Sequence, residues 1–183
     1  MALRSVAARA DTDSPLTRAQ AGDPAAFEEL LREHQSMVFS LAYRFAGDAA
    51  AAEDLAQEVF FDLSRALSRI ESPAHLMFWL RRVTTHRCID RLRRPVSREA
   101  TVEHFPEHAA SDAMRDVLLD ARIQRLVAEL PTNARAVMLL RYQEDLDPSE
   151  IATVLEISVN TVKSHLRRSV ETLREKLGVK EQA

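Results

Sequence analysis

The sequence predicts an all-α protein made of two small helical domains. The commonest residues are Ala, Leu, Arg and Glu, which are strong helix formers, and only three of the 183 residues are glycine. No convincing run of alternating apolar and polar residues indicates a β-strand. Hydrophobic residues make up 46% of the chain, which is enough for packed cores.

Two helical groups stand on either side of a polar stretch. Residues 95–111 contain two prolines and three acids with little apolar periodicity, which is typical of a linker. We therefore expect one domain over residues 21–95, a flexible acidic linker over 96–111 and a second domain over 112–180. Residues 1–20 lack the apolar core of a signal peptide and are expected to form a flexible tail.

Capping residues indicate where the helices of the first domain begin. Asp23 and Asp48 can each accept hydrogen bonds from free amides at a helix start. Helices are expected over about 24–46, 48–70 and 73–93, each with apolar residues at helical spacing.

The charge is small in sum but uneven in distribution. Net charge is −3, which by itself argues against a nucleic-acid partner. Between Trp79 and Arg94, however, six arginines stand against one acid, and residues 158–176 hold five basic residues against two acids. Residues 99–120 hold six acids and one base. Two basic patches separated by an acidic stretch favour contact with DNA.

The C-terminal part carries a helix-turn-helix pattern. Asp147, Pro148 and Glu150 form a capping box with proline at the helix start. Ser158 can cap a second helix that runs to about residue 177. Glu156 stands where such turns often have glycine, and a left-handed conformation costs a non-glycine residue about 1 kcal/mol, which favours another shape for this turn.

The second helix of this unit is amphipathic. Its apolar stripe would face the core, and its opposite face would carry donors suited to base edges and phosphates. An ordinary helical hairpin with a solvated basic face is nearly as good an interpretation of this helix alone. The candidate DNA-contact residues on its polar face and flank are Asn160, Thr161, Lys163, Ser164, Arg167 and Arg168.

A polar cluster lies in the expected second helix of the first domain. Asp54, Gln57 and Glu58 stand at positions i, i+3 and i+4, so they share one helix face. Simple solvation is the default for any one of them. An enzymatic or metal-binding role is weakly supported, because no His or Cys lies nearby to complete a ligand set.

Several motifs, in order, resemble the sigma factors of bacterial RNA polymerase. Residues 54–60 resemble the Asp-x-x-Gln-Glu-x-Phe signature of sigma region 2, and residues 79–83 and 89–94 resemble its Trp-Leu…Asp-x-Leu-Arg-Arg helix. Leu-Pro at 130–131, the segments at 139–142 and 150–152, and Thr-Val-Lys-Ser at 161–164 resemble sigma region 4. With only these two regions and a short linker, the chain is similar to the extracytoplasmic-function (ECF) group.

The resemblance implies a role for each surface. Asp54, Gln57 and Glu58 would dock on the clamp coiled coil of the largest polymerase subunit. The face from Asn160 to Arg168 would read the minus-thirty-five element, and the acidic linker would lie along the polymerase channels. The basic helix of the first domain would bind and melt the minus-ten element through Arg81, Arg82, His86, Arg91, Arg93 and Arg94. An anti-sigma factor is a further expected partner, and no cofactor is expected.

The chain departs from the family pattern at several positions. His86 stands where many members have Asn, and Arg81 where they have Tyr or Phe. Residues 71–77 also differ from the expected loop. Phe78 and Trp79 could stack on bases, although a core position is the better interpretation of Trp79. These departures leave the preferred bases open.

Other functions are weakly supported. His104 and His108 have metal-ligand spacing but lie in the proline-broken linker, and no phosphate-binding loop, dinucleotide fingerprint or nucleophile elbow occurs. The single cysteine, Cys88, excludes an intrachain disulfide and fits a reducing cytoplasm. A helix-turn-helix regulator that binds duplex DNA without polymerase is the main alternative, and a pure protein-interaction module is a third.

Overall fold

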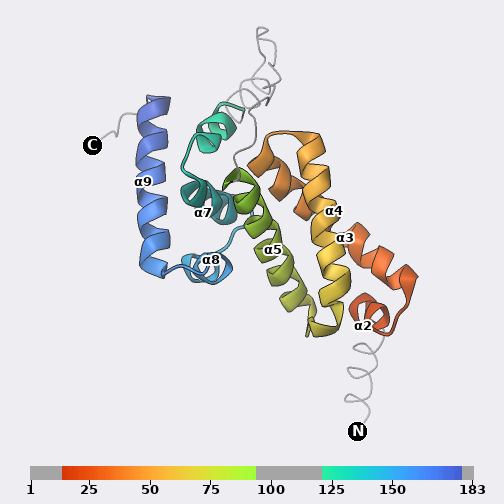
Figure 1. The fold of residues 1–183 in the computed structure, drawn as a ribbon. Coiled ribbons are helices and arrows are strands. Elements are labelled where there is room, and N and C mark those ends of the chain that lie inside the picture. The colour runs from red at the N-terminus through yellow and green to blue at the C-terminus, as the bar shows by residue number, and fades with distance from the viewer. Residues whose placement is uncertain (1–13, 94–120, 179–183) are drawn as a thin grey trace, which may run out of the picture.

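The computed structural model describes residues 14–93 and 121–178, and all regular structure in these ranges is helical (Figure 1). The all-α prediction is therefore confirmed. The first domain consists of α2 (Pro15–Gln20), α3 (Pro24–Ala46), α4 (Ala49–Ala66), the short 3-10 helix η1 (Leu67–Arg69) and α5 (Pro73–Arg93). The second consists of a helix over residues 121–128 and of α7 (Thr132–Tyr142), α8 (Pro148–Leu155) and α9 (Val159–Leu177).

The predicted N-terminal caps are present in the first domain. The carboxylate of Asp23 accepts a hydrogen bond from the amide of Ala25 at 2.9 Å, and that of Asp48 from the amide of Ala51 at 2.8 Å. Gly47 ends α3 in the left-handed conformation, with φ of 72°, which glycine adopts without steric cost. The chain can therefore reverse within two residues and lay α4 against α3.

The expectation of a flexible tail up to residue 20 is wrong for residues 14–20. Ser14 caps α2, whose residues Leu16 and Ala19 are buried in the first core. The Gln20 side-chain amide also donates hydrogen bonds to the carbonyls of Leu67 and Ile70, at 2.9 and 2.7 Å. A helix of six residues is too short to show periodicity in the sequence, so only its tertiary contacts reveal it. Residues 1–13 and the expected linker at 96–111 lie outside the described residues.

The two domains pack against each other. Figure 1 shows α5 in the middle, with α3 and α4 on one side and α7 and α8 on the other. One apolar cluster draws from both domains, because Ala136 and Leu139 of α7 join buried residues of α3, α4 and α5. The members of the cluster from the first domain are Leu41, Ala42, Phe45, Ala52, Leu55, Cys88 and Ile89.

The buried side chain of Arg135 forms hydrogen bonds across the contact between the two domains. The guanidinium of Arg135 in α7 donates to the carbonyl of Phe45, in the last turn of α3, at 2.9 Å, and also to the carbonyls of Val127 and Ala128. Helix C-termini offer unsatisfied carbonyls that favour a cation. Arg135 is only 8% exposed, and burial lowers its pKa from the ordinary value. The side chain therefore joins the two domains through backbone acceptors.

Candidate nucleic-acid interface

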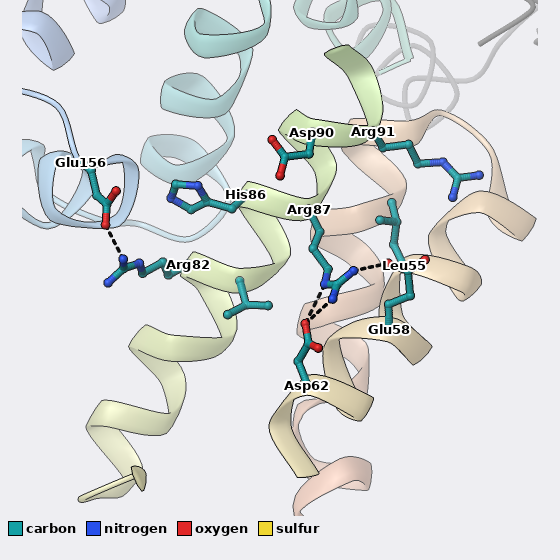
Figure 2. Close-up of a pocket in the computed structure, with 10 residues that line it drawn as sticks. Leu55, Glu58, Asp62, Arg82, His86, Arg87, Asp90, Arg91 and Glu156 are labelled. Atoms are coloured by element: carbon teal, nitrogen blue, oxygen red, sulfur yellow. Dashed lines mark hydrogen bonds and ion pairs between the residues drawn. The ribbon is translucent and has the colours of Figure 1, made fainter. Parts of the chain in front are cut away.

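The acidic and amide cluster of α4 lies on the surface, as its spacing predicts. Asp54, Gln57 and Glu58 are all exposed, while Leu55 and Val59 of the same helix are buried. Glu58 forms an ion pair with Arg87 of α5. Arg87 also donates from Nε to the carboxylate of Asp62 at 2.7 Å (Figure 2). The α5 helix thus holds one edge of this face in place.

Phe61 continues the same face and was not singled out from the sequence. Its side chain is 57% exposed, and the guanidinium of Arg65 lies 4.2 Å above its ring. Helical spacing in the sequence places Phe61 on this face, because it stands seven residues after Asp54 and four after Gln57. An exposed aromatic ring beside charged groups is typical of a protein-contact surface.

The helix-turn-helix forms as its caps predict. The carboxylate of Asp147 accepts from the amides of Ser149 and Glu150, while Glu150 accepts from the amide of Asp147 at 2.7 Å. The hydrogen bond from the Glu150 amide has the largest effect on the pKa of Asp147. Together with the bond from the Ser149 amide, it lowers this pKa. Ser158 caps α9 by accepting from the amide of Thr161 at 3.1 Å.

The turn between α8 and α9 corrects one expectation. Glu156 adopts the left-handed conformation, with φ of 56° and ψ of 39°, so the turn keeps the shape that glycine usually provides. Its amide donates to the carbonyl of Ala152, and the amide of Ile157 donates to the same carbonyl at 3.1 Å. These bonds satisfy the end of α8, which offsets the local steric cost.

The outer face of α9 is open to solvent. Val162 and Leu173 on the opposite side are buried, which orients the helix. The Thr161 hydroxyl lies 2.8 Å from that of Ser158 and so takes part in the cap. All six candidate DNA-contact residues of this helix are exposed: Asn160, Thr161, Lys163, Ser164, Arg167 and Arg168.

The basic face of α5, in contrast, contacts the second domain. Arg81 donates from Nε to the carboxylate of Glu144 at 2.9 Å, and Arg82 forms an ion pair with Glu156. His86 donates from Nε2 to the carbonyl of Val154, in the last turn of α8, at 2.9 Å. All three partners belong to the second domain.

The remaining candidates on α5 lie at its C-terminal end. Arg91 and Arg93 are exposed, and Arg93 reaches the side-chain oxygen of Asn133 at 3.4 Å. Arg94 lies outside the described residues. Trp79 packs partly buried against the core of the first domain, whereas Phe78 packs against the core of the second. Of the two rings, only Phe78 therefore contacts the second domain's core.

A polar groove of about 460 Å³ lies where α4, α5 and the turn after α8 meet. Figure 2 shows its walls, with Glu58, Asp62 and Arg87 on one side and Arg82, His86 and Glu156 on the other. Acids and arginines are mixed along it, so it is not a simple phosphate site.

Residues 14–93 and 121–178 contain neither a metal-ligand cluster nor a membrane-spanning helix. Within these ranges, no group of three or more His, Cys, Asp or Glu residues is placed to hold a metal ion. No helix in the described part of the chain is long and apolar enough to cross a membrane. Cys88 is buried, and burial raises the pKa of its thiol to about 12.

Comparison with known proteins decides the family. The models "Sigma-70 region 2" and "Sigma-70, region 4" match residues 30–98 and 120–173. The chain is 30% identical over 170 residues to the RNA polymerase sigma-H factor of Pseudomonas aeruginosa, covering 85% of this chain and 88% of that protein. It is 34% identical over 166 residues to the ECF RNA polymerase sigma factor SigE of Mycolicibacterium smegmatis, covering 85% and 64%.

This chain belongs to the ECF group of RNA polymerase sigma factors. The fold is also similar to that of the sigma factor RpoE of Bartonella quintana, solved in complex with the anti-sigma factor NepR. The TM-score is 0.66 at 18% identity, covering 85% of this chain and 98% of that one. This sigma factor is a transcription initiation factor, and its two matched regions correspond to the first and second domains. They are called region 2 and region 4 below.

Proposed function

We propose that this sigma factor docks on core RNA polymerase through the α4 face made of Asp54, Gln57, Glu58 and Phe61. The first three would meet the clamp coiled coil of the largest subunit, as the family resemblance implies. The supporting observation is that all four side chains are exposed on one helix of region 2. Phe61 would add apolar area beside these polar groups, and aromatic anchors often carry much of the binding energy at interfaces.

The DNA contacts divide between the two regions. The outer face of α9 would read the minus-thirty-five element in the major groove, with Asn160, Ser164 and Arg168 reaching base edges. On α5, the basic residues would hold the melted minus-ten element, since single-stranded DNA needs cations for its phosphates. The alternative, a helix-turn-helix regulator independent of polymerase, is not favoured, because the chain contains a matched region 2 followed by a matched region 4.

This sigma factor would act as a non-catalytic subunit, in the cytoplasm where the polymerase is. An anti-sigma factor would restrain it, and the structural similarity to a sigma factor solved with its anti-sigma partner supports that proposal. The polymerase supplies the chemistry of transcription, so the sigma factor needs only binding surfaces.

The observation that carries the proposal is the exposed α4 face, and charge reversal tests it. The double variant Asp54→Arg with Glu58→Arg should abolish co-elution with core polymerase and promoter-directed transcription. The matched control is Glu28→Arg with Glu33→Arg, which makes the same charge change at exposed positions of α3. Unchanged co-elution of the α4 variant, or equal loss in the control, would contradict the assignment of this face.

A further inference from the structure

The loop before α5 is held by a side chain from α2, the short helix near the start of region 2. The side-chain amide of Gln20 donates hydrogen bonds to the carbonyls of Leu67 and Ile70, at 2.9 and 2.7 Å. Leu67 begins η1 and Ile70 follows its last residue, so one amide group joins both ends of this turn. Figure 1 shows α2 at the end of region 2 where η1 leads into α5.

Helix α2 is itself anchored in region 2. Leu16 and Ala19 are buried in the first apolar cluster. On the other side of the helix, the guanidinium of Arg18 donates to the carboxylate of Glu29 in α3 at 2.5 Å. Gln20 therefore extends from a fixed element, although its own side chain is exposed. Its replacement would remove the two hydrogen bonds without opening a cavity in the core.

The loop that Gln20 holds is ordered around a histidine. The amide of Glu71 donates to Nδ1 of His75 at 3.1 Å, and the amide of His75 donates to the hydroxyl of Ser72 at 3.1 Å. Because Nδ1 accepts, the neutral His75 ring carries its proton on Nε2, which is then a donor. Glu71 is exposed and His75 is half-buried. The start of α5 thus combines a carboxylate acceptor with a ring donor.

These groups suit an unstacked nucleobase better than a phosphate. A base outside the stack is held by hydrogen bonds to its edge and by contact with a planar ring. Trp79 stands four residues after His75, on the same face of α5, and is partly buried against the first apolar cluster. The arginines proposed to hold the strand's phosphates begin directly after it, at Arg81.

We propose that Gln20 is a positioning residue for recognition of the minus-ten strand. Its amide fixes the turn from Leu67 to Ile70, and this turn sets where Glu71 and His75 lie relative to one base of the melted strand. The inference rests on the proposed role of α5. Helix α2 would thus contribute to promoter specificity without touching DNA, because a loop ordered in advance loses less entropy on binding.

A specificity ratio measured on the holoenzyme tests this role. The promoter is one selected from a random library by the unmodified holoenzyme. The ratio compares the affinity for its single-stranded minus-ten oligonucleotide with that for the same strand with scrambled minus-ten bases. Gln20→Met keeps the side-chain length but lacks the donors, and it should lower the ratio about fivefold or more, as for one lost base contact. Co-elution with core polymerase should not change. An unchanged ratio would overturn the proposal.

Three further variants separate positioning from a general loss of stability. Gln35→Met makes the same change at an exposed position of α3 and should leave the ratio unchanged. Ala42→Gly destabilises region 2 from the second apolar cluster and should lower the unfolding midpoint but not the ratio. Gln20→Lys supplies N–H donors on a chain of similar length and should restore most of the ratio. A similar fall in either control, or no recovery with lysine, would overturn the proposal.

A double-variant cycle tests whether Gln20 acts through the loop. His75→Ala should lower the ratio by itself, and adding Gln20→Met should lower it little further, because both changes remove the same contact. Fully additive losses would overturn the proposal.

Hydrogen exchange in the free protein follows the loop without DNA. The amide of Glu71 should exchange faster in the Gln20→Met variant than in the Gln35→Met control, because its bond to His75 depends on the fixed turn. Equal exchange would overturn the positioning role. If the unmodified holoenzyme does not prefer the selected minus-ten strand, the proposed function of α5 fails. If it does, and Gln20→Met keeps that preference, only the inference about Gln20 fails.

Discussion

Helices α5 and α9 carry similar basic surfaces but stand in different environments. The candidate residues of α9 face solvent, and no ion pair within residues 14–93 and 121–178 engages Arg167 or Arg168. On α5, Arg81 and Arg82 are both paired with acids of region 4. The difference follows from position. Helix α9 packs on α7, α8 and the helix over residues 121–128, all in region 4, whereas α5 packs on helices of both regions, α3, α4, α7 and α8 (Figure 1).

A basic helix face in the sequence does not indicate whether that face is accessible in the folded protein. In this structure the proposed duplex-reading face of α9 is exposed, whereas the proposed strand-melting residues Arg81 and Arg82 of α5 are in contact with region 4. Four measurements test this difference between α5 and α9.

The largest expected effect concerns Cys88, on the buried side of α5. Burial raises the thiol pKa from 9.0 to about 12, which lowers the thiolate fraction near neutral pH about a thousandfold. Alkylation by iodoacetamide at pH 8 should be correspondingly slow, and fast after unfolding in guanidinium. Because the unfolded chain loses this proton first, stability should fall as pH rises above about 9.0. Native alkylation at the unfolded rate would show that the side of α5 shared by the two regions is open.

Replacing Arg135 should have the next largest effect. Arg135→Met removes the donors that satisfy three carbonyls, including that of Phe45, and should lower the free energy of unfolding by about 1–3 kcal/mol. Arg167→Met on the exposed face of α9 is the matched control and should change it by less than about 0.5 kcal/mol. Urea denaturation followed by circular dichroism measures both. An equal loss of free energy of unfolding in both variants would show that the Arg135 hydrogen bonds do not stabilise the contact between the domains.

The DNA steps should respond differently to changes in α5 and α9. Arg168→Ala should weaken binding to the upstream promoter element by about 1–3 kcal/mol but leave strand opening intact in bound complexes. His86→Ala should spare duplex binding and slow opening. A binding assay on closed complexes, with a permanganate footprint of open ones, measures the two steps. The reverse pattern would mean that the roles of the helices are exchanged.

The smallest expected effect is at the turn between α8 and α9. Glu156→Gly and Glu156→Ala both remove the carboxylate, but only glycine adopts a φ of 56° without steric cost. The glycine variant should therefore be about 1 kcal/mol more stable to urea than the alanine variant. Equal stability would mean that the left-handed turn does not persist once the contact with Arg82 is removed.

Local chemistry in the sequence determined much of the secondary structure. Asp23, Asp48, Asp147 and Ser158 each cap a helix where predicted, because a cap depends on residues only two or three positions away. The exposed α4 face and the polar face of α9 follow from helical spacing in the same way. The order of motifs also led to the correct family. The assignment of individual residues to polymerase or DNA stays a prediction.

The contacts between the two domains are evident only in the folded structure. Glu144 and Glu156 are ordinary acids in the sequence, and nothing in their neighbourhood indicates that they meet Arg81 and Arg82, more than sixty residues away along the chain. Helix α2 is likewise not evident in the sequence, because its two buried side chains are stabilised only by packing against α3 and η1. Caps and spacing are local and can be identified in the sequence. The pairing of distant charges depends on how two apolar surfaces dock, and that geometry exists only in the folded chain.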